Sequence, residues 1–405
     1  MSEVTTRVPV RIAVALGLIG ALGPSAVDMY LSSLPEIARE FDTSFASVQL
    51  TLTFFLLAMG AGQLVFGPVV DAYGRRRPLL VGLALFTLCA FGAAWAPSLD
   101  MLIGFRFVQG LGSALTLVVI MSMVRDISTG VAAAKLFAML MTIEGVAPIL
   151  APAAGGFIDT HFGWRAVMLV LAALGIIVLL NSWVALAETL APGKRVALSV
   201  GAACRTYLAI ARDRAFLLPA LAVSGVFFFL FAYIGGATLV YQESYGLTAQ
   251  QFGLLFGATG ITIILGAMVA GKMVSRLGLG KLSMLGVLCM ALGATVSLVC
   301  TATGVGLVGV VAGMAIALFG LGIAESTLMS LVMSSQDTAL GSTAALLGAF
   351  QLSLSSTATP LAGLIVQQGP VAWAALLAAS AVVVCVLTKV SVPASDADTY
   401  NLAEH

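Results

Sequence analysis

The stretch GPVVDAYGRRRP, residues Gly67 to Pro78, is a polar interruption between two long apolar runs. Its three arginines, Arg75 to Arg77, cannot lie in hydrocarbon, and positively charged loops stay on the cytoplasmic side of a membrane. The stretch therefore predicts a cytoplasmic loop between two spans. The same spacing returns 204 positions later, where Gly271, Ser275, Arg276, Gly278 and Lys281 correspond to Gly67, Asp71, Ala72, Gly74 and Arg77. A loop used twice predicts a duplicated chain.

The composition indicates an integral protein of the lipid bilayer. Of the 405 residues, 60% are hydrophobic and only 9% are charged, whereas a soluble domain carries about 25% charged residues. The sequence has no Walker loop, no metal-ligand spacing, no nucleophile constellation and no basic nucleic-acid motif. It therefore argues against an ATP-driven pump, a membrane-bound enzyme, a metal site and a nucleic-acid partner.

The apolar runs predict an all-α membrane protein with twelve transmembrane helices, since a span needs about 20 apolar residues. We place them at 11–34, 46–70, 79–97, 101–123, 136–158, 165–186, 216–241, 249–271, 282–302, 305–331, 341–366 and 371–389. With both termini cytoplasmic, the inner loops and tails hold sixteen of the nineteen Lys and Arg residues and the outer loops hold two. Arg106 remains inside a helix. This asymmetry supports the count and the direction of threading.

The longest polar interval divides the chain into two pseudo-symmetric six-helix bundles. We expect one bundle over 1–186, a cytoplasmic linker over 187–214, a second bundle over 215–390 and a cytoplasmic tail over 391–405. The linker is expected to carry a short surface helix over Val200 to Ile210. The indoles of Trp95, Trp164, Trp183 and Trp373 fall near predicted helix ends, and we expect them to be interfacial anchors.

Four ionisable side chains remain within predicted spans, and each is a candidate for function because burying charge in a bilayer is costly. Asp28 and Arg106 lie at similar depths, roughly 9 Å from the outer ends of their helices. One interpretation is a structural ion pair. The other is that Asp28 exchanges a proton, with a charge state that depends on the distance to Arg106.

The other two charges are carboxyl groups. Glu144 lies near the midplane, where transporter sites tend to lie, and is a candidate for proton or cation coupling and for substrate binding; the alternative is a protonated core carboxyl. Glu325, in the inner third of its helix, either contacts substrate or marks a solvated helix end. Asp71 is expected to lock the cytoplasmic side closed.

Two further patterns bear on helix contacts and substrate. A single predicted helix contains Pro148, Pro152, Gly155 and Gly156, which bend it and let a neighbour approach closely. Aromatic side chains cluster in another, where Phe227, Phe231 and Tyr233 are candidates for a substrate-contacting wall with Tyr30 opposite. The alternative is that these aromatic residues face lipid.

Three motifs resemble those of the major facilitator superfamily. GPVVDAYGRRRP is similar to its signature loop, matching at Gly67, Asp71, Gly74 and Arg77 and departing at Ala72, where a basic residue is usual. RFVQGLGSA, from Arg106 to Ala114, is similar to the fourth-helix motif, whose arginine is associated with proton transfer. APILAPAAGG, from Ala147 to Gly156, resembles the fifth-helix motif of the drug antiporters, with Ala147 and Ala151 where glycines are usual.

Other segments resemble the Bcr/CflA drug-resistance subfamily more narrowly. They are VDMYLSSLPEIAREF at 27–41, VQLTL at 48–52, VRD at 124–126 and AET at 187–189. The resemblance implies export of bicyclomycin, phenicols or similar drugs, with Asp28 and Arg106 in a proton pathway. It also implies a bacterial inner-membrane protein that uses the proton as its coupling ion and needs no other cofactor.

We therefore expect a monomeric exporter of amphipathic drug-like molecules, driven by proton entry, whose two bundles rock around a central cavity. The first alternative is a transporter of a small metabolite or polyamine on the same scaffold. The second is a membrane receptor or scaffold that transports nothing, against which the four intramembrane charges argue.

Overall fold

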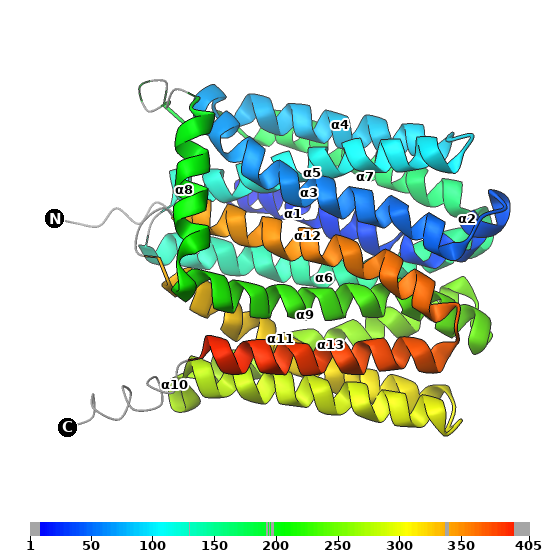
Figure 1. Ribbon diagram of the computed structural model, residues 1–405. Helices are drawn as coiled ribbons and strands as arrows, with labels where there is room; N and C mark the ends of the chain where they lie inside the picture. The colour runs from blue at the N-terminus through cyan, green and yellow to red at the C-terminus, as the bar shows by residue number, and fades with distance from the viewer. Residues whose placement is uncertain are drawn as a thin grey trace, which may run out of the picture.

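The computed structural model describes residues 9–392 apart from 129, 192, 194, 196–197 and 337–339, and of 130–135, 137–139, 141–145, 200 and 340 it describes the backbone alone. Every regular element in this part of the chain is a helix. Figure 1 shows the long helices side by side, with a shorter helix, α8 (Val200–Arg212), crossing them at one end. We call this the α8 end, and the opposite one, beside α2 (Leu34–Glu40), the α2 end.

The long helices form two sets, one before α8 in the chain and one after it. The first set is α1 (Val10–Asp28), α3 (Phe45–Tyr73), α4 (Arg76–Ala94), α5 (Leu99–Ile127), α6 (Gly130–Phe162) and α7 (Trp164–Ala185). The second set is α9 (Arg214–Leu239), α10 (Ala249–Ala302), α11 (Leu307–Ser334), α12 (Leu340–Val366) and α13 (Pro370–Ser391). Short 3-10 and π turns, η1 (Leu31–Ser33) and η3 (Val240–Ser244), extend α1 and α9. The surface helix expected in the linker is present as α8.

Ten helices in the described part are long and apolar enough to cross a membrane, so the chain is an all-α membrane protein. One of the ten, α10, has 54 residues and covers two of the predicted spans, 249–271 and 282–302. A straight helix of that length would extend about 80 Å, well beyond the roughly 30 Å of a hydrocarbon core. Another predicted span, 136–158, lies in α6 and is not among the ten; many of its side chains lie outside the described residues.

The two predicted copies of the loop share an unusual backbone conformation. Gly74 ends α3 at φ 91°, ψ −177°, and Gly278 interrupts α10 at φ 75°, ψ 161°. Positive φ with extended ψ is a region that residues with a Cβ rarely adopt. The two glycines stand 204 positions apart, which is the interval of the sequence repeat. At each one the chain turns back between two antiparallel helices.

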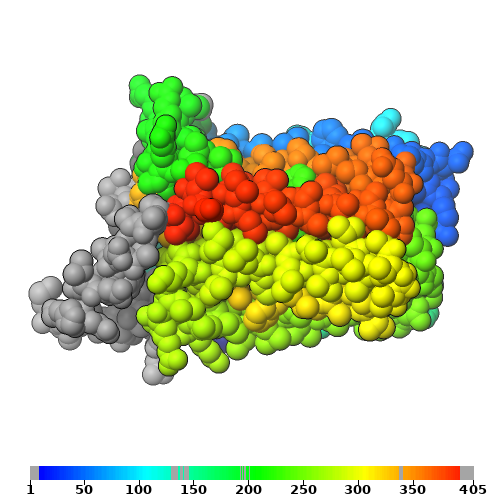
Figure 2. Space-filling view, turned by 60° about the horizontal axis from the view of Figure 1, so that its bottom comes forward, coloured from blue at the N-terminus to red at the C-terminus, as the bar shows by residue number. Residues whose placement is uncertain are grey.

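Each set of helices packs within itself and meets the other along two seams. In Figure 1 the blue and cyan helices occupy one side of the bundle and most of the green to red helices the other. The first seam joins α3 to α12, and the second joins α6 to α10. Figure 2 shows the outer surface of the second set, where α13 lies alongside the α10 and α11 pair. Any rocking of the sets must act at these seams.

The tryptophan expectation is correct for two indoles and wrong for two. Trp95 and Trp183 are 59% and 60% exposed, as interfacial anchors should be. Trp164 and Trp373 are fully buried instead. The indole N–H of Trp164 donates to a Glu40 carboxylate oxygen at 2.5 Å, and that of Trp373 donates to the carbonyl of Ala232 at 3.1 Å. A partner inside the protein makes the membrane interface unnecessary.

Candidate functional site

Arg106 is fully buried in the first set of helices and has no acidic partner among the described residues. One guanidinium nitrogen donates to Gln109 Oε1 at 2.7 Å and another to the carbonyl of Ala26 at 2.9 Å. The guanidinium carbon lies 4.7 Å from the ring centre of Tyr30 and 4.4 Å from that of Phe55. Two aromatic faces and two neutral oxygens therefore stabilise this cation.

Asp28 lies close along α1 to Ala26, the residue whose carbonyl accepts from Arg106, but it does not pair with the arginine. It is the last residue of α1, two positions beyond Ala26, and is only 6% exposed. No ion pair joins Asp28 to Arg106, although both residues are described. The arginine instead bonds to the α1 backbone. The structure thus places the predicted acid and cation at neighbouring positions without bringing them into contact, and the structural ion pair is absent.

Tyr30 belongs to the arginine site, and its predicted place in a substrate-contacting wall stays a prediction. Its ring contacts Arg106, and its hydroxyl lies 3.0 Å from Thr51 Oγ1. The Thr51 hydroxyl in turn donates to the carbonyl of Val48 at 2.7 Å. Tyr30 is fully buried. These contacts fix the ring against α3.

A stripe of unpartnered polar atoms follows one face of α5 and starts at Arg106. Arg106 Nε, Gln109 Nε2 and Ser113 Oγ are all buried, and none has a hydrogen-bond partner among the described residues. Their spacing of three and four residues places them on one face of a helix. Buried donors without partners are costly, so the stripe is suited to bind an oxygen of water, substrate or a carboxylate. Sequence reasoning missed Gln109 and Ser113, although both lie within the quoted motif RFVQGLGSA.

The aromatic residues of α9 pack into the second set of helices. Tyr233 is buried and stacks on Phe256 of α10, with ring centres 5.3 Å apart and planes inclined by 5°. Its other neighbour is Trp373, at 6.2 Å. Phe231 is 8% exposed, and Phe227 is half-buried. The lipid-facing alternative is therefore wrong for Phe231 and Tyr233.

Of the two remaining acids in predicted spans, the structure describes the side chain of Glu325 but not that of Glu144. Glu144 lies on α6, but its side chain is outside the described residues. Glu325 lies on α11 and is half-buried, with Thr327 fully buried two positions further along. Neither position is part of the arginine site as the structure describes it.

A network of charges holds the loop between α3 and α4 at the α8 end. Arg75 donates to Asp71 Oδ1 at 2.7 Å and to Asp126 Oδ2 at 2.9 Å. Thr189 also donates to Asp126, at 2.8 Å. The partner of Asp71 is therefore Arg75 of its own half, and the predicted role of Asp71 in locking the cytoplasmic side closed stays a prediction. The network ties α3 to α5 and to the segment after α7.

The buried arginine of the loop is Arg75, not Arg77. Arg75 is 6% exposed, whereas the side chain of Arg77 is exposed. Arg276, which stands in the second copy of the loop at the position of Ala72, is also exposed. Gly67 lies on α3, where an added Cβ would come within 3.6 Å of the Tyr207 hydroxyl. The motif match located the loop but not the arginine that holds it.

Glu188 caps α4 from a distant part of the chain, and sequence reasoning missed this role. Its carboxylate accepts the backbone N–H groups of Arg75 at 2.9 Å and Arg76 at 3.3 Å. A third N–H, from Leu190, donates to it at 3.0 Å. A Cβ on Gly74 would overlap this carboxylate. The glycine is needed for its positive φ, and its missing Cβ leaves room for the carboxylate in this position.

Glu188→Gln is expected to destabilise the loop at neutral pH by roughly 1 kcal/mol, as for loss of a helix cap. Burial disfavours the charged form, but the four N–H groups of Arg75, Leu190, Arg76 and Thr189 outweigh it and lower the pKa of Glu188. Because the pKa is lowered on folding, the ionised carboxylate stabilises the folded state at any pH above the ordinary glutamate pKa of about 4.3. This stabilisation is lost as the pH falls through the pKa of the folded state. Thermal unfolding of detergent-solubilised protein at pH 7 and below pH 4 measures the change.

The variant should unfold at a lower temperature than the wild type at pH 7. The difference between the two unfolding temperatures should be smaller below pH 4. Glu243→Gln, which removes an exposed carboxylate at the α2 end, serves as the matched control. Equal unfolding temperatures for the two variants at pH 7 would show that Glu188 does not hold the loop.

The proline and glycine run of α6 forms the second seam. A Cβ on Gly155 would overlap the carbonyl of Met29, and one on Gly156 would overlap that of Ala249 in α10. From the other side, Cβ atoms on Gly253 and Gly257 would overlap the carbonyls of Pro152 and Ile149. Backbone thus meets backbone, which only residues without side chains permit.

Sequence reasoning did not single out the glycine face of α10. In the segment FGLLFGATG, Gly253, Gly257 and Gly260 recur at intervals of four and three residues, a spacing that places small residues on one helix face. Pro148 lies at the edge of this contact that faces the α8 end, where its carbonyl would be 3.8 Å from a Cβ on Gly260. Close packing against a neighbouring helix was the predicted role of the α6 run, and the structure shows that α10 is this neighbour.

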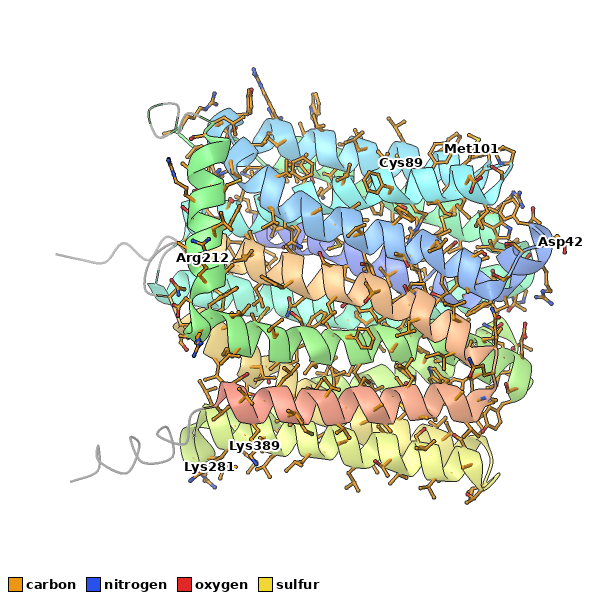
Figure 3. All side chains as sticks on the ribbon, in the orientation of Figure 1. Asp42, Cys89, Met101, Arg212, Lys281 and Lys389 are labelled. Atoms are coloured by element: carbon orange, nitrogen blue, oxygen red, sulfur yellow. The ribbon has the colours of Figure 1, made fainter. Side chains whose placement is uncertain are left out.

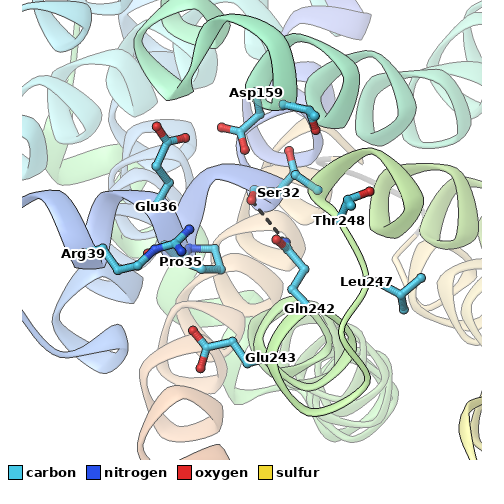
Figure 4. Close-up of a pocket in the computed structure, with 11 residues that line it drawn as sticks. Ser32, Pro35, Glu36, Arg39, Asp159, Gln242, Glu243, Leu247 and Thr248 are labelled. Carbon is cyan, nitrogen blue, oxygen red and sulfur yellow. Dashed lines mark hydrogen bonds between the residues drawn. The ribbon is translucent and has the colours of Figure 1, made fainter.

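A cavity of about 460 Å³ opens at the α2 end between the two sets of helices (Figure 4). Glu36 and Asp159 line it on one side and Glu243 on the other. The Glu36 and Asp159 carboxyls lie on the same wall of the cavity. The Ser33 hydroxyl donates to Asp159, at 2.5 Å.

The walls of this cavity touch across the seam. Gln242 Nε2, at the end of α9, donates to the carbonyl of Ser32 at 3.2 Å (Figure 4). This bond joins η3 of the second set to η1 of the first. The sequence predicted a central cavity. This cavity lies instead at the α2 end of the bundle, on the outer side of the contact between α6 and α10.

Comparison with known proteins agrees with the motifs and the fold. The family model described as Major Facilitator Superfamily matches residues 16–360. An uncharacterized MFS-type transporter of Bacillus subtilis, YdgK, is 36% identical over 362 residues, covering 89% of this chain and 90% of that protein. A bicyclomycin resistance protein homolog of Haemophilus influenzae is 31% identical over 263 residues, 65% of this chain and 66% of that one.

Solved structures share the architecture at low sequence identity. The crystal structure of a D-xylose-proton symporter superposes with a TM-score of 0.75 at 17% identity, covering 96% of this chain and 99% of that one. Identity this low shows the fold alone. Together with the family match, the paired loops and the two seams, it shows that this chain belongs to the major facilitator superfamily.

Proposed function

We propose that the protein exports amphipathic drug-like molecules in exchange for protons, by alternating access of a site between its two sets of helices. The relative from Haemophilus influenzae is named for bicyclomycin resistance, and it covers about two thirds of this chain. The observation that carries the proposal is the buried Arg106 beside the end of α1, which has no acidic partner in the described part of the chain. A cation kept in this position at high cost is expected to serve transport.

The threading that we propose has twelve spans and both termini in the cytoplasm of a bacterium, with the α8 end inside. The backbone turn at Gly278 divides α10 into two spans, and α6 supplies another. Figure 3 supports this direction, because Arg212, Lys281 and Lys389 gather at the α8 end and Asp42 lies at the other. The bundles then cover 1–186 and 215–390, joined by the linker 187–214, and the molecule works as a monomer in the inner membrane.

Proton movement in this proposal uses Asp28 and the arginine site. Asp28 lies two residues beyond the carbonyl to which Arg106 bonds, so a small shift of α1 changes the distance between acid and cation. An ionised Asp28 would draw the guanidinium from its present acceptors. A protonated one would leave it where it is. The stripe of Gln109 and Ser113 offers hydrogen-bond donors to a substrate or a water in the same region.

Closure at the α2 end supports alternating access as the transport cycle. The glycine contacts of α6 with α10 and the bond from Gln242 to Ser32 shut this side. Outward opening must break both. Glu144 and Glu325, together with the aromatic residues Phe227 and Phe231, are the further side chains that we propose for substrate contact or coupling.

One observation favours the alternative of a cationic metabolite or polyamine as substrate. The cavity at the α2 end carries three carboxyl groups, from Glu36, Asp159 and Glu243, against the single cation of Arg39. An acidic vestibule attracts cations leaving or entering the transporter. The substrate test therefore includes cationic compounds beside neutral drugs.

The function is tested in everted membrane vesicles, energised to be acid inside and loaded with a pH-sensitive dye. The panel consists of a phenicol, bicyclomycin, a lipophilic cation and a polyamine. A compound that releases protons from the lumen with Asp28 intact, and not in Asp28→Asn, establishes proton-coupled export and names the substrate class. If no compound moves protons in vesicles that contain folded protein, the proposal fails for this panel's chemistry and a non-transporting role gains support.

Glu144→Gln is expected to change the pH profile of export or the preference between neutral and cationic compounds, because it removes a charge near the midplane. Export rates between pH 6 and 8 for one neutral and one cationic substrate measure both effects. Glu325→Gln, the same change in the second half, is the matched comparison. An unaltered profile and preference in Glu144→Gln would assign this residue to structure.

A further inference from the structure

Helix α8 lies beside the bundle and not beyond its end. The hydroxyl of Tyr207 donates to the carbonyl of Leu64 at 3.2 Å. Leu64 is nine residues before Tyr73, where α3 ends, and therefore lies about 14 Å from that end along the helix axis. Figure 2 shows α8 projecting sideways from the bundle. The helix is thus level with the last turns of the spans, the depth at which a bilayer has its headgroups.

The position of α8 along the bundle coincides with the first seam. It packs on α12 and α9 of the second set and reaches α3 of the first through Tyr207. Figure 1 shows it crossing these helices nearly at right angles to them. A helix in this orientation lies parallel to the membrane surface.

The two faces of α8 differ in composition. Tyr207 and Ile210 face the bundle, and Ile210 is 4% exposed. Arg205 and Arg212 are exposed, and they stand seven residues apart, which places them on one face about 10 Å from each other. Leu208, between them, is 55% exposed. A face with basic ends and an apolar centre is typical of helices that lie in a lipid interface.

No acid among the residues that the structure describes forms an ion pair with this face. None of the ion pairs among the described residues includes Arg205 or Arg212. The nearest acid in sequence, Asp213, accepts hydrogen bonds from Gln336 at 2.6 Å and from the Ala215 backbone at 2.9 Å. The two guanidinium groups are therefore available to anions outside the protein.

We propose that the exposed face of α8, formed by Arg205, Leu208 and Arg212, binds the headgroups of anionic phospholipids in the leaflet at the α8 end. The guanidinium groups contact phosphate, and the leucine enters the boundary between headgroups and acyl chains. Because α8 bridges the seam between α3 and α12, bound lipid rests on the contact that rocking must open. The lipid composition of the leaflet thereby acts on the balance between the two conformations.

Cys204 supplies a reporter for this face, since it is exposed and adjacent to Arg205. The full chain is labelled at Cys204 with a fluorophore after the other four cysteines (Cys89, Cys289, Cys300 and Cys385) are replaced by serine. It is then reconstituted in phosphatidylcholine vesicles containing a spin-labelled lipid, either phosphatidylglycerol or phosphatidylcholine. Quenching by the anionic label relative to the neutral one measures enrichment at α8.

We expect the anionic label to quench more strongly, with a preference that declines as salt is raised. Replacing Arg205 and Arg212 by glutamine should reduce the preference about fivefold for each arginine, the ratio that corresponds to roughly 1 kcal/mol per basic residue at an anionic leaflet. Both side chains are exposed and free of ion pairs among the described residues, so the variant should fold. Lys389→Gln, which removes an exposed cation at the same end, should retain the preference.

Three results would overturn the proposal. Equal quenching by the two lipids would show that the face does not select anions. An undiminished preference in the double variant would assign the selection to other residues. Quenching by aqueous iodide with none by either lipid would show that the face opens to water.

Discussion

Arg106→Ala is expected to abolish substrate-driven proton movement in everted vesicles, lowering the rate by about a hundredfold or more, as loss of a positioned proton-transfer group does. The guanidinium bonds to α1 at Ala26 and to Gln109 within α5, so it fixes α1 close to Asp28. Alanine removes both bonds and leaves the rings of Tyr30 and Phe55 without the cation between them. The dye assay with a substrate from the panel measures the loss.

Arg106→Lys distinguishes the effect of the positive charge from that of the two hydrogen bonds. Lysine keeps the cation, but a single ammonium cannot reproduce the two bonds that separate guanidinium nitrogens make at 2.7 and 2.9 Å. We expect it to transport poorly while remaining folded, as judged by size-exclusion chromatography in detergent. Undiminished export in both Arg106→Ala and Asp28→Asn would exclude the proposed proton pathway.

Gly253→Ala is expected to hold the transporter open at the α2 end. The added Cβ overlaps the carbonyl of Pro152, so α6 and α10 cannot keep their present distance. Overpacking of this kind costs about 1–3 kcal/mol, which shifts a two-state equilibrium roughly ten- to a hundredfold. Export should fall accordingly. A cysteine at Ser32, a position only 1% exposed when this side is closed, should react faster with a membrane-impermeant maleimide added from outside.

Gly260→Ala is the matched control, because it makes the same substitution on the same face of α10. Its Cβ would lie 3.8 Å from the carbonyl of Pro148, an ordinary contact that requires no movement. It should transport and react like the parent protein. If the two alanine variants label at the same rate, closure does not depend on the Gly253 contact.

The sequence predicted the fold well wherever the signal was local. Charge and hydropathy located most of the spans and the linker helix, and the repeated spacing predicted a loop used twice, in which Gly74 and Gly278 share a positive φ. These features depend on segments of about 10 to 25 residues whose chemistry differs sharply from that of their neighbours. Burial in lipid and exposure to water impose that difference directly.

The sequence did not reveal which side chains meet. In a run of three arginines, only the helix phase after Gly74 decides that Arg75 turns inward and Arg77 outward. Glu188 caps a helix whose first residues lie more than a hundred positions earlier in the chain. The interior of a membrane protein and the lipid around it are equally apolar, so hydropathy cannot distinguish the faces of a span. For the same reason it could not show that Arg106 bonds to α1 and leaves Asp28 unpaired.

The network around Arg75 also bears on the order of events during synthesis. Its members Asp71, Asp126 and Glu188 all precede α9 in the chain. Every contact that fastens this loop is therefore available before the ribosome has made α9. The first half can complete its own junction while the second half is still being translated. Helices α9 to α13 then insert beside a first set that has already assembled, which reduces the number of incorrect helix contacts that they can form.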